Sequence, residues 1–365
     1  MDAAALRAEF PVLQRVAYLN SGTDGPIPAA AVAASREELD AELADGRVHA
    51  HFERRRALQS ELRAGYATIL GCAPEDVALT TSTSDGIGRV LAGLDLGPGD
   101  EIVTSDQEHP GLVGPLIAAR LRGVAVRAVP MRDLADAVGP STTLVACSHV
   151  NWVTGETIPA GLTQAGVPVV LDGAQGSGAV PVDVKALGCS AYAASGQKWM
   201  CGADGTGMLY IAPEFRARVR VIAPSYMSFE DASKGLDASL RDSAAAYDTP
   251  SLAREAVAFS LAALRVLEAA GLQAVHARAA ALAAELAQRL AGRGRAVSPR
   301  GETTLVSFRD PDPPATRQRL FDAGVVVRDL PGTPLLRASV GAWNDASDLD
   351  RLLAALGRPL LDGSR

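Results

Sequence analysis

The sequence predicts an α/β protein with a mostly parallel sheet covered by helices on both faces, plus a smaller C-terminal α+β domain. Three observations support this prediction. Between residues 75 and 211, short apolar segments alternate with helical segments and are separated by glycine-containing turns. Residues 251–293 read as two long Ala/Leu-rich helices that break near Gly271. After Arg300 the pattern changes to short strands interspersed with two helices.

The expected elements follow in chain order. The N-terminal segment predicts a short helix, a Gly/Pro turn at residues 21–26, a helix from about Pro28 and another helix over 49–70. The alternating region predicts a short strand that ends at 80–83, a helix over 84–94, a helix after Pro110, and strands at 101–105, 124–129, 143–148, 168–171, 190–194 and 207–211. The C-terminal region predicts a strand over 303–308, a helix over 315–323, strands over 325–328 and 335–340, and a helix over 346–356.

Two domains are predicted from this order of elements. The large domain spans residues 15–270, and the small domain spans 271–365 together with residues 1–14. A chain of 365 residues that is 48% hydrophobic and 21% charged can bury a core of this size.

The net charge and the cysteine spacing argue against several classes of partner and site. A net charge of −7 argues against nucleic acid or an anionic membrane surface as the main partner. The four cysteines show neither CxxC spacing nor a zinc-binding pattern, so we expect a reduced, cytoplasmic setting and no metal. No stretch approaches roughly 18 apolar residues, so no membrane span is expected, and the acid-containing N-terminus is a poor signal peptide.

A lysine and a strand-end acid form the most informative pair. Asp172 ends an apolar run of Val and Leu, as expected for a buried strand that delivers a carboxylate to the sheet edge. Lys198 lies among small and apolar residues and precedes several glycines, which indicates a partly buried amine of lowered pKa. Pyridoxal phosphate requires one amine to bind it covalently and one carboxylate to keep its ring nitrogen protonated. The pair therefore predicts this cofactor.

Other polar residues fit the same cofactor. The hydroxyl-rich run from Thr80 to Gly86 enters a helix, where free backbone N–H groups and a positive helix end favour a phosphate. Ser195 and Gln197 would add donors from beside the lysine. His109 follows a strand end, and its flat ring suits stacking on the cofactor or moving protons.

Two arginines are candidates for the substrate. Arg337 interrupts an apolar strand, and a buried guanidinium needs a partner, which can be an internal acid or the α-carboxylate of a substrate. Arg328 is a second candidate by the same reasoning. The glycine-rich run 202–207 precedes a strand and lacks the lysine–hydroxyl pair of a P-loop, so it predicts neither a Rossmann nor a P-loop site.

Taken together, these motifs resemble the class V aminotransferase family, which includes the cysteine desulfurases and has the aspartate-aminotransferase-like fold with a seven-stranded sheet. The resemblance rests on residues 18–21, 80–86, 108–109, 172–175, 195–198, 205–207 and 337–339. It implies the following site residues: Lys198, His109 and Asp172 for catalysis; Ser82, Thr83, Gln175, Ser195, Gln197 and Thr249 as further cofactor contacts; and Arg337, Arg328, Asn151, Trp152 and Asn20 at the substrate.

Individual roles also follow from the resemblance. Lys198 would bind the cofactor covalently and later move a proton, Asp172 would bind the pyridine nitrogen and Gln175 the ring hydroxyl. Thr249 resembles a threonine that reaches the phosphate of a partner subunit. The resemblance therefore implies a homodimer with shared active sites.

The chain departs from the family pattern in three places. Many relatives carry histidine where Gln197 stands, and desulfurases often carry asparagine where this chain has Trp152. Desulfurases also use a mobile cysteine just before the strand of Arg337, but residues 328–334 contain none. A persulfide-forming desulfurase is therefore disfavoured, because its nucleophile is missing.

The leading prediction is C–S β-elimination on cysteine, cystine or a cysteine conjugate. Two enzymatic alternatives remain open: an aminotransferase, and an amino-acid epimerase of the isopenicillin-N-epimerase-like branch. A non-catalytic cofactor-binding regulator is disfavoured, because the complete lysine constellation is present and little sequence precedes Tyr18.

Overall fold

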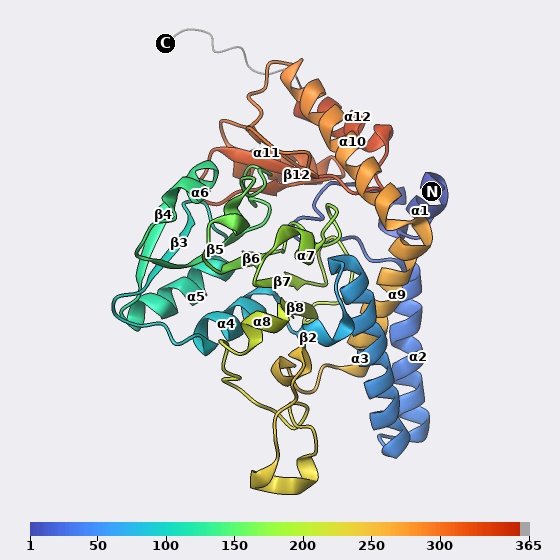
Figure 1. The fold of residues 1–365 in the computed structure, drawn as a ribbon. Helices are drawn as coiled ribbons and strands as arrows, with labels where there is room; N and C mark the ends of the chain where they lie inside the picture. The colour runs from blue at the N-terminus through green and yellow to red at the C-terminus, as the bar shows by residue number, and fades with distance from the viewer. Residues whose placement is uncertain (358–365) are drawn as a thin grey trace.

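The computed structural model describes residues 1–357 and contains a seven-stranded central sheet in the order β2-β8-β7-β6-β5-β3-β4. Its strands are β2 (Val77–Thr80), β3 (Glu101–Ser105), β4 (Ala125–Val129), β5 (Thr142–Ser148), β6 (Val169–Asp172), β7 (Ala191–Ser195) and β8 (Gly207–Ile211). Only β8 runs antiparallel to its neighbours. This arrangement confirms the predicted mostly parallel sheet, and Figure 1 shows it at the centre of the molecule.

The central strands are buried, as expected for a parallel sheet with helices on both faces. All residues of β2, β6, β7 and β8 are buried. The helices are α1 (Ala3–Ala8), α2 (Ala29–Asp45), α3 (His49–Leu70), α4 (Thr83–Gly93), α5 (Pro110–Leu121), α6 (Leu134–Ala137), α7 (Val184–Leu187), α8 (Pro213–Arg216), α9 (Arg254–Ala270), α10 (Leu272–Ala291), α11 (Pro313–Asp322) and α12 (Ala346–Leu356). Helices α4 and α5 pack together beneath the sheet in Figure 1, whereas α2, α3 and α9 form a bundle beside it.

The long C-terminal helices break where the sequence predicts. Helix α9 ends at Ala270 and α10 begins at Leu272, with Gly271 between them at φ 84°. This backbone conformation is readily available to glycine. Helix α11 begins at Pro313, two residues before the predicted start, because Asp312 caps the helix by accepting a hydrogen bond from the Ala315 N–H.

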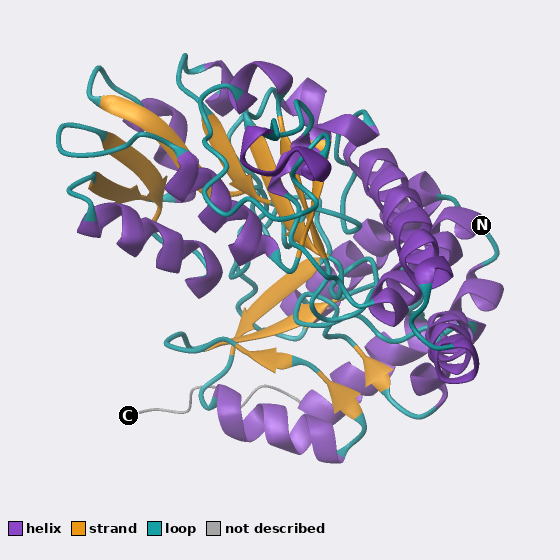
Figure 2. Ribbon diagram, turned by 90° about the horizontal axis from the view of Figure 1, so that it is seen from below, coloured by secondary structure: helices purple, strands orange, loops and turns teal. Residues whose placement is uncertain are grey.

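The C-terminal elements form a second layer above one edge of the central sheet (Figures 1 and 2). Strands β9 (Leu305–Arg309), β11 (Arg328–Asp329) and β12 (Leu335–Ser339) make an antiparallel sheet with β12 in the middle. A hydrophobic cluster joins this layer to helices α10 and α12 and includes Leu286, Phe308 and Leu352.

The prediction of a single strand over 325–328 is wrong. Val325–Val326 (β10) pairs in parallel with Ala17–Tyr18 (β1), whereas Arg328–Asp329 pairs with β12. The chain changes partner at Val327: the residues before it pair with the N-terminal segment, which itself bridges to β12 through Asn20 and Ser339, and the residues after it pair with β12 directly. The N-terminal segment thus joins the C-terminal layer through residues 17–18. The predicted domain division at residue 270 stays a prediction, and its last residues, 358–365, lie outside the described part.

A pair of glycines in α4 tests how closely this helix packs on the sheet. A Cβ at Gly86 would lie 2.7 Å from the Ala193 Cβ of β7, whereas a Cβ at Gly88 meets nothing within 4 Å. We expect Gly86→Ala to lower the free energy of unfolding by about 1–3 kcal/mol through overpacking. Gly88→Ala should raise it by about 0.5–1 kcal/mol through helix propensity. Urea unfolding of both variants measures the difference, and equal effects would contradict the close approach.

Candidate active site

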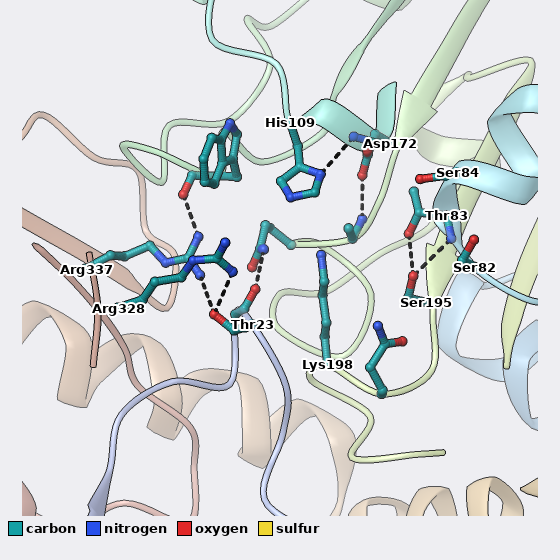
Figure 3. A pocket seen from close by; sticks show the side chains of 16 residues that line it. Thr23, Ser82, Thr83, Ser84, His109, Asp172, Ser195, Lys198, Arg328 and Arg337 are labelled. Atoms are coloured by element: carbon teal, nitrogen blue, oxygen red, sulfur yellow. Dashed lines mark hydrogen bonds between the residues drawn. The ribbon is translucent and has the colours of Figure 1, made fainter. Parts of the chain in front are cut away.

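A cavity of about 250 Å³ opens at the carboxyl edge of the central sheet, where open α/β sheets bind ligands. The C-terminal layer closes one side of the cavity through Arg328 and Arg337 (Figure 3). The lining residues are Gly22, Thr23, Ser82, Thr83, Ser84, His109, Gly111, Trp152, Asp172, Ala174, Gln175, Ser195, Gln197, Lys198, Arg328 and Arg337. Residues far apart in the sequence therefore meet at one site.

Lys198 points into this cavity from the loop that follows β7 (Figure 3). Burial lowers the pKa of its amine to about 8, and the carboxylate of Asp172 partly opposes this shift. The loop is held by backbone hydrogen bonds from Gly25 N to Gln197 O (2.8 Å) and from Gly202 N to Gly196 O (2.9 Å). A Cβ at Gly25 would lie 2.1 Å from the Lys198 carbonyl oxygen, so this close approach requires glycine.

Asp172 is the last residue of β6 and lines the same cavity as Lys198. Burial raises the pKa of its carboxyl, whereas the Lys198 charge and a 2.9 Å hydrogen bond from Ala174 N act in the opposite direction. A buried carboxylate of this kind needs a cationic partner to remain ionised. A protonated ring nitrogen would be such a partner, so Asp172 fits a pyridine ring in the cavity.

The start of α4 and the end of β7 form a cluster of hydrogen-bond donors. Thr83 N donates to Ser195 Oγ (2.9 Å), and the Thr83 and Ser195 hydroxyls lie 2.8 Å apart. Ser82 caps the helix by accepting a hydrogen bond from Asp85 N (3.1 Å). Gln197 lines the same cavity, and its amide Nε2 group is a further hydrogen-bond donor. Hydroxyls, an amide and a helix N-terminus that face one cavity fit a phosphate group.

His109 faces the cavity between the start of α5 and Trp152. Its Nδ1 accepts a hydrogen bond from Gly111 N (3.0 Å), and its ring meets the Trp152 indole edge-on with centroids 5.1 Å apart. Burial, assisted by the nearby charge of Lys198, lowers the pKa of His109 to about 4. The ring is therefore neutral at physiological pH and available for stacking on another flat ring.

Two arginines face the cavity from the C-terminal layer. The Arg337 Nη1 group donates to the Trp152 carbonyl (2.7 Å), and the Arg328 Nη1 group donates to Thr23 Oγ1 (3.1 Å). Burial, followed by repulsion from Arg328, lowers the pKa of Arg337 to about 9. The Arg337 Nε atom has no hydrogen-bond partner, and neither guanidinium is ion-paired with an acidic side chain of residues 1–357. Both fit an anion supplied from outside the protein.

Three predicted site residues do not line the cavity. Asn20 accepts a hydrogen bond from Thr23 Oγ1 (2.8 Å), and Asn151 accepts from Val153 N (2.8 Å), so both shape the loops behind cavity residues. Thr249 donates to Asp85 Oδ2 (2.7 Å) and accepts from Arg89 Nη2 (2.9 Å), outside the cavity of its own chain.

Gln175 lines the cavity, but both ends of its amide are already engaged. Its Nε2 group donates to the Gly22 carbonyl (2.7 Å), and its Oε1 atom accepts from Trp199 Nε1 (3.0 Å). Its predicted contact with a ring hydroxyl would require a change in these bonds.

Sequence reasoning missed five lining residues: Gly22, Thr23, Ser84, Gly111 and Ala174. Ser84 and Ala174 are immediate neighbours of the predicted residues Thr83 and Gln175. Thr23 is the informative omission, because its hydroxyl contacts both Arg328 and Arg337 (3.1 and 3.4 Å), which lie more than 300 positions away in the chain. Its position in a Gly/Pro turn gave no local signal of this contact.

Residues 1–357 contain neither a helix suited to a membrane nor a cluster of metal-binding side chains. No helix of this part of the chain is long and apolar enough to cross a membrane. No group of three or more His, Cys, Asp or Glu residues in it is arranged to hold a metal ion.

The chain is similar to known proteins over almost its whole length. The aminotransferase class-V family matches residues 17–352. The chain is 30% identical to isopenicillin N epimerase of Amycolatopsis lactamdurans over 97% of both proteins, and 29% identical to probable cysteine desulfurase 2 of Mycobacterium leprae, with 99% of this chain and 97% of the relative covered.

Solved structures extend the similarity. A mutant of C-DES with glycine covalently linked to its pyridoxal-phosphate cofactor superposes with a TM-score of 0.91 at 27% identity, covering 96% of this chain and 98% of that one. The complex of the cystine C–S lyase C-DES with its product cysteine persulfide gives a TM-score of 0.89 at 27% identity, covering 95% and 98%. The chain belongs to the class-V aminotransferase family and is a pyridoxal-phosphate-dependent enzyme.

Proposed function

We propose that the protein is a C–S β-lyase that acts on cystine or another cysteine conjugate. The observation that carries this proposal is an active-site cavity that no cysteine lines. Cys147 and Cys201 are buried, and burial raises the pKa of both thiols well above the ordinary value. Burial also raises the pKa of Cys72 and Cys189 to about 12. A desulfurase needs a reactive thiolate at the substrate sulfur, and this chain offers none.

The cavity geometry supports the following cofactor contacts. Lys198 would hold pyridoxal phosphate covalently, Asp172 would face its ring nitrogen and His109 would lie against the ring. The phosphate contacts in this proposal are Ser82, Thr83, Ser195 and Gln197, with Gln175 at the ring hydroxyl. When bound, the cofactor supplies an electron-accepting ring next to the substrate α-carbon.

Within this proposal, Lys198 moves the α-proton. An amine whose pKa is about 8 can both accept and donate a proton near neutral pH. After the α-proton is removed, the C–S bond breaks and the sulfur keeps its electron pair. The remaining three-carbon fragment reacts with water, so cystine and one water give cysteine persulfide, pyruvate and ammonia.

The two arginines support an amino-acid substrate with more than one anionic group. Arg337 is buried and would bind the substrate α-carboxylate, assisted by Trp152 and its loop. Arg328 is partly exposed and retains free donors after its bond to Thr23. Cystine carries a second carboxylate on the far side of its disulfide, and the guanidinium of Arg328 would bind this group.

Two other reactions remain candidates. Epimerisation is favoured by the full-length 30% identity to isopenicillin N epimerase. Transamination would use the same residues and is the activity after which the family is named. We also retain two further proposals: a homodimer in which Thr249 reaches the partner's phosphate site, and a cytoplasmic location.

Incubation of the purified enzyme with L-cystine and with cysteine conjugates tests the proposal. We expect pyruvate and ammonia in equal amounts, and unchanged rates in Cys201→Ala, because no thiol takes part. Absence of pyruvate from every conjugate would overturn β-elimination. Exchange of the α-proton with solvent deuterium and loss of optical activity would then indicate epimerisation, and an amine form of the cofactor restored by a 2-oxo acid would indicate transamination.

A further inference from the structure

A second cavity, of about 350 Å³, adjoins the active-site cavity. Thr23 and Arg328 line both cavities, so these two side chains lie between them. The second cavity continues along Arg317 and Phe321 of α11 and along Asp329 of β11. A substrate held by its α-carboxylate at Arg337 could therefore extend past Arg328 into this space.

The second cavity carries separated charges and one exposed ring. Arg317 Nε lies 2.9 Å from Asp329 Oδ1, and the two side chains are 42% and 29% exposed, so both remain accessible to a ligand. The Phe321 side chain, 59% exposed, lines the same space. The cavity is lined by two arginines, Arg317 and Arg328, and one acid, Asp329. The net charge of these side chains is +1, which favours an anionic ligand group.

We propose that this cavity binds the leaving-group half of the substrate and selects a leaving group that ends in a carboxylate. This inference rests on the β-elimination proposed above. Arg317 and Arg328 would donate to the distal carboxylate, Asp329 would accept from a distal ammonium group, and Phe321 would cover the apolar carbons between them. The distal half of L-cystine carries both charged groups, whereas a neutral or purely cationic leaving group satisfies fewer of these contacts.

A set of disulfides with identical reacting bonds tests the inference. L-Cystine is compared with the mixed disulfides of L-cysteine with 3-mercaptopropionate, 2-mercaptoethanol and cysteamine, which end in a carboxylate, a hydroxyl and an ammonium group. We expect kcat/KM for pyruvate formation to be about tenfold or more higher for cystine and the mercaptopropionate disulfide than for the neutral one, and lowest for the cysteamine disulfide. Equal values across the set, or preference for the neutral disulfide, would overturn the proposal.

Variants in α11 identify the residue responsible. Arg317→Gln should lower kcat/KM for the mercaptopropionate disulfide about tenfold, the loss of one charge-assisted hydrogen bond, and Arg317→Lys should restore part of it. Arg319→Gln is the matched control, because Arg319 lies on the same helix but donates to the Ala355 carbonyl (2.6 Å) and does not line the cavity. An equal loss in both glutamine variants would show a structural effect and overturn the assignment of Arg317.

Two further measurements separate this inference from the proposed reaction. β-Chloro-L-alanine has a leaving group too small to enter the second cavity, so its conversion to pyruvate reports elimination alone and should not change in Arg317→Gln. Apparent dissociation constants, taken from the change in cofactor absorbance on addition of each disulfide, report binding whichever reaction follows. No pyruvate from any compound would refute β-elimination, whereas equal dissociation constants for the charged and neutral disulfides would refute the leaving-group site.

Discussion

Lys198→Ala is expected to abolish covalent cofactor binding and to lower the turnover rate by at least about 10⁴-fold, while the protein stays folded. The reason is that Lys198 is the only lysine lining the active-site cavity, and its amine, with a pKa of about 8, is the basic group beside Asp172. Removal of the amine from a solvent-accessible cavity leaves the surrounding hydrophobic core intact.

The chain contains only two other lysines, Lys185 and Lys234, which makes the experiment decisive. Both lie outside the cavity on exposed segments, so Lys185→Ala and Lys234→Ala serve as matched controls. Borohydride reduction of the holoenzyme followed by peptide mass spectrometry should locate the cofactor on Lys198 alone. A normal cofactor absorbance band in Lys198→Ala, or label on either control lysine, would contradict the assignment.

Asp172→Asn is expected to keep the covalent cofactor but to lower kcat on the order of 10²–10³-fold. Asparagine has the same shape and can still accept a hydrogen bond from Ala174 N, so the turn after β6 should be retained. It carries no charge, however, and cannot keep a ring nitrogen protonated in a buried site. The loss should therefore appear in the chemical step rather than in folding.

Rapid-reaction kinetics and thermal unfolding separate these effects. The variant should unfold at a temperature equal to or above that of the wild type, because burial raises the pKa of the Asp172 carboxyl and its charge is unfavourable in the absence of a partner. Asp183→Asn, at the exposed N-cap of α7, is a control for the loss of an acid elsewhere. If Asp172→Asn kept activity within a few-fold of the wild type, the proposed role of Asp172 at the ring nitrogen would be wrong.

Much of the fold and site could be predicted because the signals were local. The alternation of buried strands and helices fixed the positions of β3 and β8, which match the predicted ranges. Asp172 and Lys198 each occupy a short motif next to a strand, and the carboxyl ends of parallel strands necessarily meet at one edge. The sequence alone therefore determined the fold class and the cofactor, and it predicted that Asp172 and Lys198 lie together, as they do in the active-site cavity.

The tertiary structure decided what depends on contacts between distant segments. The division of the predicted strand 325–328 follows from pairing with residues 17–18 and with β12, and no local pattern encodes a choice between two edges. The hydrogen bond from Arg328 to Thr23 likewise depends on how the N-terminal turn packs against the C-terminal layer. Residue type predicts which chemistry a side chain can perform, but only packing fixes its direction and neighbours, and these determine the second cavity beyond Arg328.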